Sequence, residues 1–366
     1  TAFKAGTQSA DITYTLPTAQ GSSNTFLKND GSGNLSWAAP NSLGNFVESV
    51  NSSAPNASVP VVQLLASNAA TNVDIALTPK GSGALTAQIA DNTSAGGNKR
   101  GTNSVDWQTT RTSASQVASG INSTIGGGYQ NTASANYATV AGGNVNYATA
   151  QAATVAGGNG NLASGSYSAI SGGDGNTASS TGSHIGGGYS NNATNQYTTI
   201  SGGYGNSAIS TYATVAGGYF NGVQNSYATV AGGRSNLASG ISSFVGGGGD
   251  NGVSPGGNTA TGIVSATLGG YANWNDGDYS AILGGRGLTL SSFAKRSVGF
   301  NSNNSSGSLQ MTIDAPDVAV FANSNLWLAN NKNTPSELRF YEAQNTSGAF
   351  PTASTNFTSF KAGTQT

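Results

Sequence analysis

The chain of 366 residues contains no cysteine and a single histidine. Without cysteine it can form neither a disulfide nor a thiolate metal site, and one histidine leaves little room for a zinc site or a Ser-His-Asp triad. Charge is equally scarce, because 13 Lys and Arg face 14 Asp and Glu. Nucleic acid is held mainly through clustered Lys and Arg. We therefore expect no metal, no cofactor and no nucleic-acid partner.

Long hydrophobic runs are also missing. No stretch approaches the roughly 18 consecutive apolar residues of a transmembrane helix, so we expect no membrane span. The 54 glycines are numerous but lack the Gly-X-Y period of collagen. Charged residues are 7% and hydrophobic residues 36%, whereas disordered chains usually combine high charge with low hydrophobicity. These proportions favour an ordered, mostly β structure.

What the sequence does contain is a 15-residue repeat that starts near residue 121. A glycine pair occurs in every unit, as at Gly142-Gly143, two residues after an aliphatic residue. The aliphatic residues of nine successive units are Ile125, Val140, Val155, Ile170, Ile185, Ile200, Val215, Val230 and Val245. A unit of this length is too short for a helix pair, but it fits one coil of a parallel β-solenoid with two short strands and two turns.

An asparagine follows the glycine pair in every unit. The series is Asn131, Asn146, Asn161, Asn176, Asn191, Asn206, Asn221, Asn236 and Asn251. Side-chain amides that repeat once per coil can bond along the stack and to the turn backbone. We predict that these asparagines form a structural ladder at one corner of the solenoid, and that the aliphatic series fills its core.

The segment from Tyr137 to Val140 shows which side chains face the core. Alternate side chains of a strand point to opposite faces. Ala138 and Val140 should therefore point into the coil, and Tyr137 and Thr139 should point outward. Each coil then buries only a few small side chains, which is a thin core for so many ordered residues.

The flanks of this repeat carry almost no charge. Residues 121–249 hold two formal charges, Asp174 and Arg234. A surface so poor in charge is hard to reconcile with a soluble monomer. We expect lateral self-association that buries the outward tyrosines, with a homotrimer favoured.

Two stretches carry a family resemblance: NTASANYATVAGG (131–143) and NLASGSYSAISGG (161–173). They are similar to the head repeats of trimeric autotransporter adhesins and to Gly-Asn-Ala-rich repeats of bacteriophage tail fibres. The resemblance covers residues 115–290 and implies a left-handed parallel β-roll with three chains side by side. It also implies a location outside the cell or on the virion surface.

Composition and register divide the chain into four parts. Residues 1–115 read as a β-hairpin-rich module, 116–253 as the regular solenoid, 254–290 as irregular coils with an inserted loop, and 291–366 as a C-terminal β module. Hairpins are expected where Phe26-Leu27 meets Leu35–Trp37 and where Ile75–Leu77 meets Ala84–Thr86, since Gly-rich turns lie between them. A further strand is expected at Glu337–Tyr341.

The two ends of the chain repeat one another. Residues 1–9 read TAFKAGTQS and residues 358–366 read TSFKAGTQT, identical at seven of nine positions. The shared FKAGTQ segment indicates either one period of a longer tandem protein or equivalent strand positions in a head-to-tail filament. Contacts of that kind that do not close generate fibres.

Candidate chemistry is confined to the irregular coils. Trp274, Asp276, Asp278 and Tyr279 combine aromatic and carboxylate groups, which suit a glycan contact, although a solvated turn has the same composition. Because the regular coils contain no carboxylate pair for glycan cleavage, we expect no enzyme and no catalytic residues. The leading hypothesis is a non-enzymatic structural fibre. The alternative is an adhesin or tailspike whose specificity for a glycan or host receptor lies in residues 250–290.

Overall fold

The computed structural model describes residues 13–23, 25–38, 46–51, 61–66, 77–249, 256–302, 310–324, 337–341 and 357–361. Every helix or strand assigned within these ranges is a strand, which confirms the all-β prediction. Contacts divide the chain into two units, Thr1–Thr78 and Pro79–Thr366. Each unit is described by itself.

The first unit contains two antiparallel strand pairs. β1 (Phe26–Asn29) pairs with β2 (Leu35–Ala38), as the sequence predicted. The turn between them is held by Asp30, whose Oδ1 accepts hydrogen bonds from the backbone N–H groups of Ser32 at 2.8 Å and Asn34 at 3.1 Å. The other pair joins β3 (Phe46–Asn51) to β4 (Val61–Ala66).

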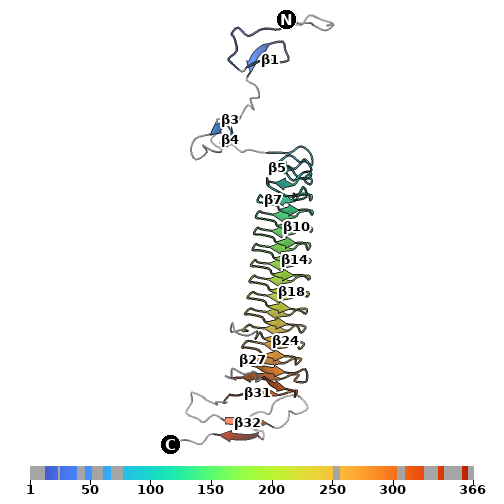
Figure 1. Cartoon of the computed structure of the whole chain (residues 1–366), viewed down its shortest axis with the longest axis vertical. Helices are drawn as coiled ribbons and strands as arrows, with labels where there is room; N and C mark the ends of the chain where they lie inside the picture. Colours follow the sequence, from blue (N-terminus) through green and yellow to red (C-terminus); the bar gives the residue numbers. More distant parts are fainter. Residues whose placement is uncertain are drawn as a thin grey trace. The chain divides into compact units, whose positions relative to one another are not determined.

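The second unit is built on two parallel sheets, which Figure 1 shows as a stack of coils from teal to orange. In the described residues, one sheet has 15 strands: β5 (Leu85–Thr86), β6 (Val105–Asp106), β7 (Thr124–Ile125), β9 (Thr139–Val140), β11 (Thr154–Val155), β13 (Ala169–Ile170), β15 (His184–Ile185), β17 (Thr199–Ile200), β19 (Thr214–Val215), β21 (Thr229–Val230), β23 (Phe244–Val245), β25 (Ala266–Thr267), β27 (Ala281–Gly285), β29 (Val298–Asn301) and β31 (Ala319–Ala322).

The other sheet lies on the opposite side of each coil. Its 12 strands in the described residues are β8 (Thr132–Ala133), β10 (Tyr147–Ala148), β12 (Leu162–Ala163), β14 (Thr177–Ala178), β16 (Asn192–Ala193), β18 (Ser207–Ala208), β20 (Gly222–Val223), β22 (Leu237–Ala238), β24 (Thr259–Ala260), β26 (Trp274–Asn275), β28 (Leu288–Leu290) and β30 (Met311–Ile313). The alternation of strands between the two sheets confirms a parallel β-solenoid.

Successive coils stack in register at the period read from the sequence. Val155 pairs with Val140 on one side and with Ile170 on the other. Backbone hydrogen bonds join successive coils at the corners as well as along the strands. Tyr137 N–H donates to Ile121 C=O and Tyr129 N–H donates to Gly143 C=O, each at 2.9 Å. Strand and corner backbone groups are thus satisfied by the neighbouring coils, as buried polar groups require.

The core is a narrow column of small side chains. Ala138 and Val140 are fully buried while Tyr137 is 55% exposed, so the predicted inward and outward alternation is confirmed. The aliphatic series and the alanines beside it form one continuous cluster from Ala118 to Ala260. Each coil buries too little apolar surface to fold alone, so its stability depends on the coils above and below.

A polar layer interrupts this core near the C-terminal end. Thr267 lies in register between Val245 and Ile282, and its side chain is fully buried. Next to it, Asn275 is also buried and its Nδ2 donates to the carbonyls of Ala266 at 3.0 Å and Ser280 at 3.1 Å. A second apolar cluster follows this layer: Ile282, Leu288, Leu290 and Ala294.

The stack is longer than the predicted 116–253 solenoid and 254–290 irregular coils. At the N-terminal side, Leu85–Thr86 pairs in parallel with β6 and is the first strand of the large sheet. The hairpin expected at Leu85–Thr86 stays a prediction, because the expected partner Ile75-Ala76 lies outside the described residues. At the C-terminal side β30 and β31 continue the two sheets, so part of the predicted C-terminal module belongs to the stack.

Separate hairpin structure does occur further along the chain. β32 (Glu337–Tyr341) pairs antiparallel with β33 (Phe357–Lys361), so the strand predicted at 337–341 is confirmed. The inserted loop predicted after residue 250 falls mostly on residues 250–255, which lie outside the described residues.

The two glycines of the Gly142-Gly143 pair have different roles. The second glycine of the nine pairs has φ between +82° and +94°, and a Cβ on Gly143 would lie 2.3 Å from the carbonyl oxygen of Gly158 in the next coil. Gly142 lies outside the left-handed region, and a Cβ there would meet nothing within 4 Å. In this pair only the second position therefore requires glycine, whereas the first glycine of seven other pairs has φ between +143° and +157°, which also disfavours a side chain.

This difference predicts opposite outcomes for two adjacent substitutions. Gly143→Ala should lower the free energy of unfolding by about 2 kcal/mol or more, because it adds backbone strain and an intercoil clash. Gly142→Ala should leave stability unchanged or raise it by up to about 1 kcal/mol, because it restricts the unfolded chain. Chemical denaturation followed by circular dichroism measures both. Equal destabilisation by the two variants would contradict this assignment.

Candidate functional site

The buried asparagines connect each coil to the next. Asn176 Nδ2 donates to the carbonyls of Gly172 in its own turn and Gly188 in the next coil, both at 3.0 Å. Its Oδ1 accepts the backbone N–H of Asn191 at 3.0 Å, and Asn161 Oδ1 accepts the backbone N–H of Asn176 at 3.1 Å. The series from Asn131 to Asn236 is at most 1% exposed. These are mainly side-chain to backbone bonds, and they fix the turn that contains the glycine pair.

A glutamine begins the ladder at its N-terminal end. Gln108 is fully buried, and its Oε1 accepts the backbone N–H of Asn131 at 2.6 Å. Its Nε2 donates to the carbonyls of Gln116 at 2.8 Å and Asn131 at 3.2 Å. Sequence reasoning missed Gln108, because it lies 23 residues before Asn131 and outside the 15-residue period.

The ladder continues further than predicted at its C-terminal end. Asn236 Oδ1 accepts the backbone N–H of Asn258 at 2.9 Å, so Asn258 occupies the rung that the period assigned to Asn251. Asn251 lies outside the described residues. Asn273 forms the next rung, and its Oδ1 accepts the backbone N–H of Leu288 at 3.0 Å. The sequence carries a signal for this rung, because Gly269-Gly270 ends three residues before Asn273, the same spacing as in the regular coils.

One corner of the solenoid carries a stacked aromatic group, which we name the first tyrosine column: Tyr189, Tyr204 and Tyr219. The rings stack with centroids 5.0 Å apart at both steps. Phe220 packs edge-on against Tyr219 at 4.5 Å, and the Arg234 guanidinium lies 5.0 Å from the Tyr219 ring centroid. Neighbouring aromatic and cationic groups therefore cover part of this column, whose tyrosines are 38–47% exposed.

The other corner carries a longer tyrosine row. Tyr197, Tyr212 and Tyr227 stack with centroids 5.3 and 5.2 Å apart. We define the tyrosine edge by two groups of residues at this corner. Six tyrosines occupy the same turn position in their coils: Tyr137, Tyr167, Tyr197, Tyr212, Tyr227 and Tyr279. In three other coils an isoleucine lies one residue before that position: Ile121, Ile241 and Ile263. All nine are 43–64% exposed.

Backbone geometry holds the tyrosine edge in place. The six tyrosines have φ between +56° and +62°, the left-handed region that non-glycine residues seldom adopt. In each coil the backbone N–H at this position donates to the preceding coil, as Tyr197 N–H does to Thr181 C=O at 2.9 Å. The turn thus directs every ring outward at the same corner, and stacking further orders Tyr197, Tyr212 and Tyr227.

The irregular coils bring two of the four predicted glycan-contact residues together. Trp274 lies on the outer face of β26 and is 48% exposed, and its Nε1 donates to Asp276 Oδ1 at 2.5 Å. The same carboxylate oxygen accepts the Thr261 hydroxyl. Tyr279 lies instead at the following corner, on the tyrosine edge, and is 64% exposed. The structure therefore supplies a fixed, exposed indole rather than a cluster of four.

Asp278 is engaged in its own ion pair. Its Oδ2 lies 2.8 Å from Lys295 Nζ, and its Oδ1 accepts the backbone N–H of Ile263 at 3.0 Å. The Lys295 hydrogen bond, together with that of Ile263, lowers the pKa of Asp278 below its ordinary value. Because Asp276 and Asp278 each bond to the preceding coil, both stabilise the coil contact itself.

Comparisons with known proteins assign no family to this chain. No protein-family model matches the chain, and no curated protein matches it significantly. Across the described ranges, no cluster of three or more His, Cys, Asp and Glu side chains could hold a metal ion. In the same part of the chain, no helix has the length and apolar character needed to cross a membrane.

The ladder geometry predicts a large effect for one buried amide. Asn176→Ala should lower the free energy of unfolding by at least about 2 kcal/mol, because it leaves buried backbone groups of three residues without their side-chain partner. The matched control is Asn144→Ala, which removes an exposed amide that donates to Asn159 Oδ1 at 2.7 Å. That variant should change stability by no more than about 0.5 kcal/mol. Denaturation curves showing equal effects would contradict the structural role of the ladder.

Proposed function

We propose that this protein is a non-enzymatic shaft of a fibre or filament that assembles laterally into a homotrimer through the tyrosine edge. The single observation that carries the proposal is a row of preordered, half-exposed tyrosines along an almost uncharged stack. Residues 121–249 contain two formal charges, and the tyrosines of the edge are 47–64% exposed. Such apolar exposure marks interaction surfaces in soluble proteins.

The tyrosine edge suits a second and third copy of the same chain. Its repeat matches the coil spacing, so copies aligned side by side present equivalent rings at the same levels, with a continuous row at Tyr197, Tyr212 and Tyr227. Tyrosine supplies large contact area, and its hydroxyl can remain at the wet rim of an interface. Because Tyr197, Tyr212 and Tyr227 are already stacked on one another, their association costs less additional conformational entropy.

End-to-end growth is the second part of the proposal. FKAGTQ occurs at residues 3–8 and again at 360–365, which supports equivalent strand positions in successive subunits. Head-to-tail contacts that do not close extend into filaments. We place the assembled protein outside the cell or on a virion surface, the setting implied by the resemblance of its repeats to adhesin heads and tail fibres.

Sedimentation of the full chain tests the lateral interface. At micromolar concentration the chain should sediment at three times its monomer mass or as higher multiples of the trimer. Joint Tyr197→Ser, Tyr212→Ser and Tyr227→Ser substitution should shift the population to monomer, because it removes the stacked part of the tyrosine edge. The matched control replaces Tyr189, Tyr204 and Tyr219 by Ser and should remain trimeric. A monodisperse monomer of the unaltered chain would overturn the proposal.

A second candidate function, glycan or receptor attachment, is favoured by one observation. Trp274 is 48% exposed on the outer face of the irregular coils, and Asp276 fixes its indole. A rigid, exposed indole offers an apolar face to a sugar ring. The residues involved belong to the part of the stack that departs from the regular repeat.

Attachment of the intact protein to a glycan array tests this second function. Trp274→Ala should abolish the signal if the irregular coils bind sugar. Trp107→Ala removes another exposed indole, which is 45% exposed, and should leave the signal intact. Binding that survives Trp274→Ala, or an array with no signal for the unaltered chain, would count against an adhesin.

A further inference from the structure

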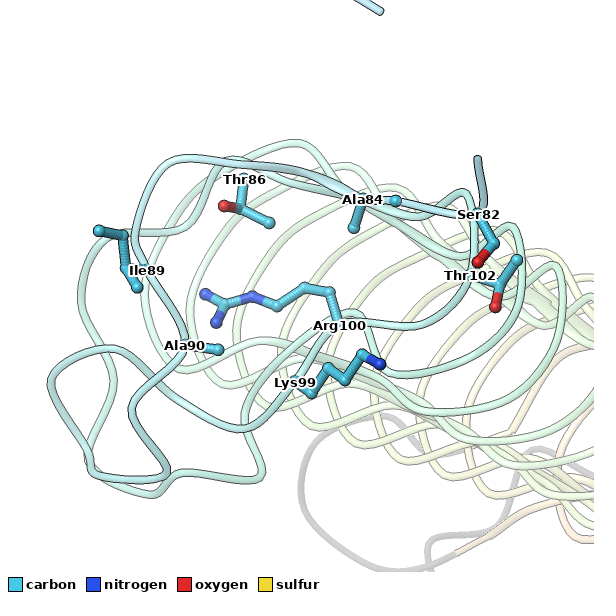
Figure 2. Close-up of a pocket in the computed structure, with 9 residues that line it drawn as sticks. Ser82, Ala84, Thr86, Ile89, Ala90, Lys99, Arg100 and Thr102 are labelled. Atoms are coloured by element: carbon cyan, nitrogen blue, oxygen red, sulfur yellow. The ribbon is translucent and has the colours of Figure 1, made fainter. Parts of the chain in front are cut away.

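A cavity lies at the N-terminal end of the coil stack, within the second unit. Its volume is about 430 Å³, and its lining includes Ser82, Thr86, Ile89, Lys99, Arg100 and Thr102. Figure 2 shows the Arg100 side chain extending across the ring of lining residues, with its guanidinium between Thr86 and Ala90 in this view. The volume lies within the usual range of small-molecule sites.

Two buried guanidinium groups and a buried carboxylate lie beside this cavity. Arg100 Nε lies 2.8 Å from Asp106 Oδ2, and Arg111 Nη2 lies 3.8 Å from the same oxygen. The three side chains are at most 1% exposed. Two guanidinium groups thus share one carboxylate. The neighbouring Asp91 accepts hydrogen bonds from Thr93 and Gly96 in its own exposed turn.

Hydrogen bonding distinguishes the two arginines. Arg111 donates from all three guanidinium nitrogens to protein oxygens, including Gln88 Oε1 at 2.6 Å and Gln108 C=O at 2.6 Å. Arg100 donates from Nε to Asp106 and from Nη1 to two carbonyls, whereas its buried Nη2 has no acceptor. Burial, followed by the charge of Arg100, lowers the pKa of Arg111 from its ordinary value, and the charges of Asp106 and Asp91 partly oppose this shift.

A polar cap on the apolar core does not account for this arrangement. Solenoids need polar groups at their terminal coils, and Gln108 and Gln116 meet that need here with satisfied hydrogen bonds. A buried guanidinium nitrogen without an acceptor is costly, and a cap does not require one. The buried Arg100 Nη2, which has no acceptor, lies on a residue that lines the cavity, and an anion bound there would supply the missing acceptor.

We propose that this cavity binds a small hydroxylated carboxylate of the size of one acidic sugar. A guanidinium nitrogen without an acceptor suits a carboxylate oxygen, and the exposed residue Lys99 also lines the cavity. Ser82, Thr86 and Thr102 offer hydroxyls to the hydroxyl groups of the ligand, and Ile89 offers an apolar contact. The site is independent of the tyrosine edge and of Trp274.

Saturation-transfer NMR titration of the full chain tests the proposal with D-glucuronate as the probe and D-glucose as its uncharged counterpart. Glucuronate should bind with a dissociation constant on the order of 1 mM or below, and glucose at least about tenfold more weakly. Lys99→Gln should weaken glucuronate binding roughly threefold or more, and Arg100→Gln roughly tenfold or more. Lys28→Gln, an exposed lysine of the first unit, is the matched control and should change nothing.

Several outcomes would overturn the proposal. Glucose binding as tightly as glucuronate would show that charge is irrelevant. Acetate or sulfate binding as tightly as glucuronate would show that the hydroxyl lining adds nothing. Arg100→Gln removes a buried ion pair and can unfold the first coils. If circular dichroism shows that this variant has lost structure, glucuronate binding by the Lys99→Gln and Thr86→Val variants decides the test instead. Unchanged glucuronate binding in both of those variants would exclude this cavity.

Discussion

The fold depends on hydrogen bonds between successive coils, and above all on those made by one buried asparagine per coil. Each coil encloses little more than an aliphatic side chain and one or two small residues, so apolar burial within a coil cannot hold its two turns in place. The asparagine amide binds the carbonyl of its own turn and the carbonyl and N–H groups of the next coil. It therefore fixes the turn and the register together. The second glycine of each pair completes this arrangement, since a Cβ there would collide with the carbonyl oxygen that the amide binds.

Much of this architecture could be predicted from the sequence, because coils that stack in register require the same residue types at a fixed spacing along the chain. The inward side of Val140, the outward side of Tyr137 and the all-β solenoid all follow from a repeat that never slips over nine units. What could not be predicted lies where the chain leaves the period. Gln108 begins the ladder after an irregular interval, and Asn258 takes a rung displaced by the insertion after residue 249.

The candidate sites were less predictable than the fold. Composition placed Trp274, Asp276, Asp278 and Tyr279 in one group. In the folded coil these sequence neighbours lie apart, because Trp274 is on a sheet face and Tyr279 is at a corner. Asp278 pairs with Lys295, which lies in the next coil and is invisible to a local motif search. The cavity beside Arg100 gave no sequence signal, because its residues come from two non-repetitive coils. The scarcity of charge, by contrast, bears directly on the tyrosine edge. Because this surface is almost uncharged, electrostatic repulsion would not oppose the approach of a second copy of the chain.

Amide hydrogen exchange of the full chain tests the central claim most directly, because it measures the bond between ladder side chain and neighbouring backbone. The N–H groups from Asn146 to Asn236 each donate to the asparagine one coil earlier, so they should be among the slowest to exchange and should have similar protection factors along the stack. Exchange of these N–H groups as fast as that of the exposed Asp30–Asn34 turn in the first unit would contradict the account.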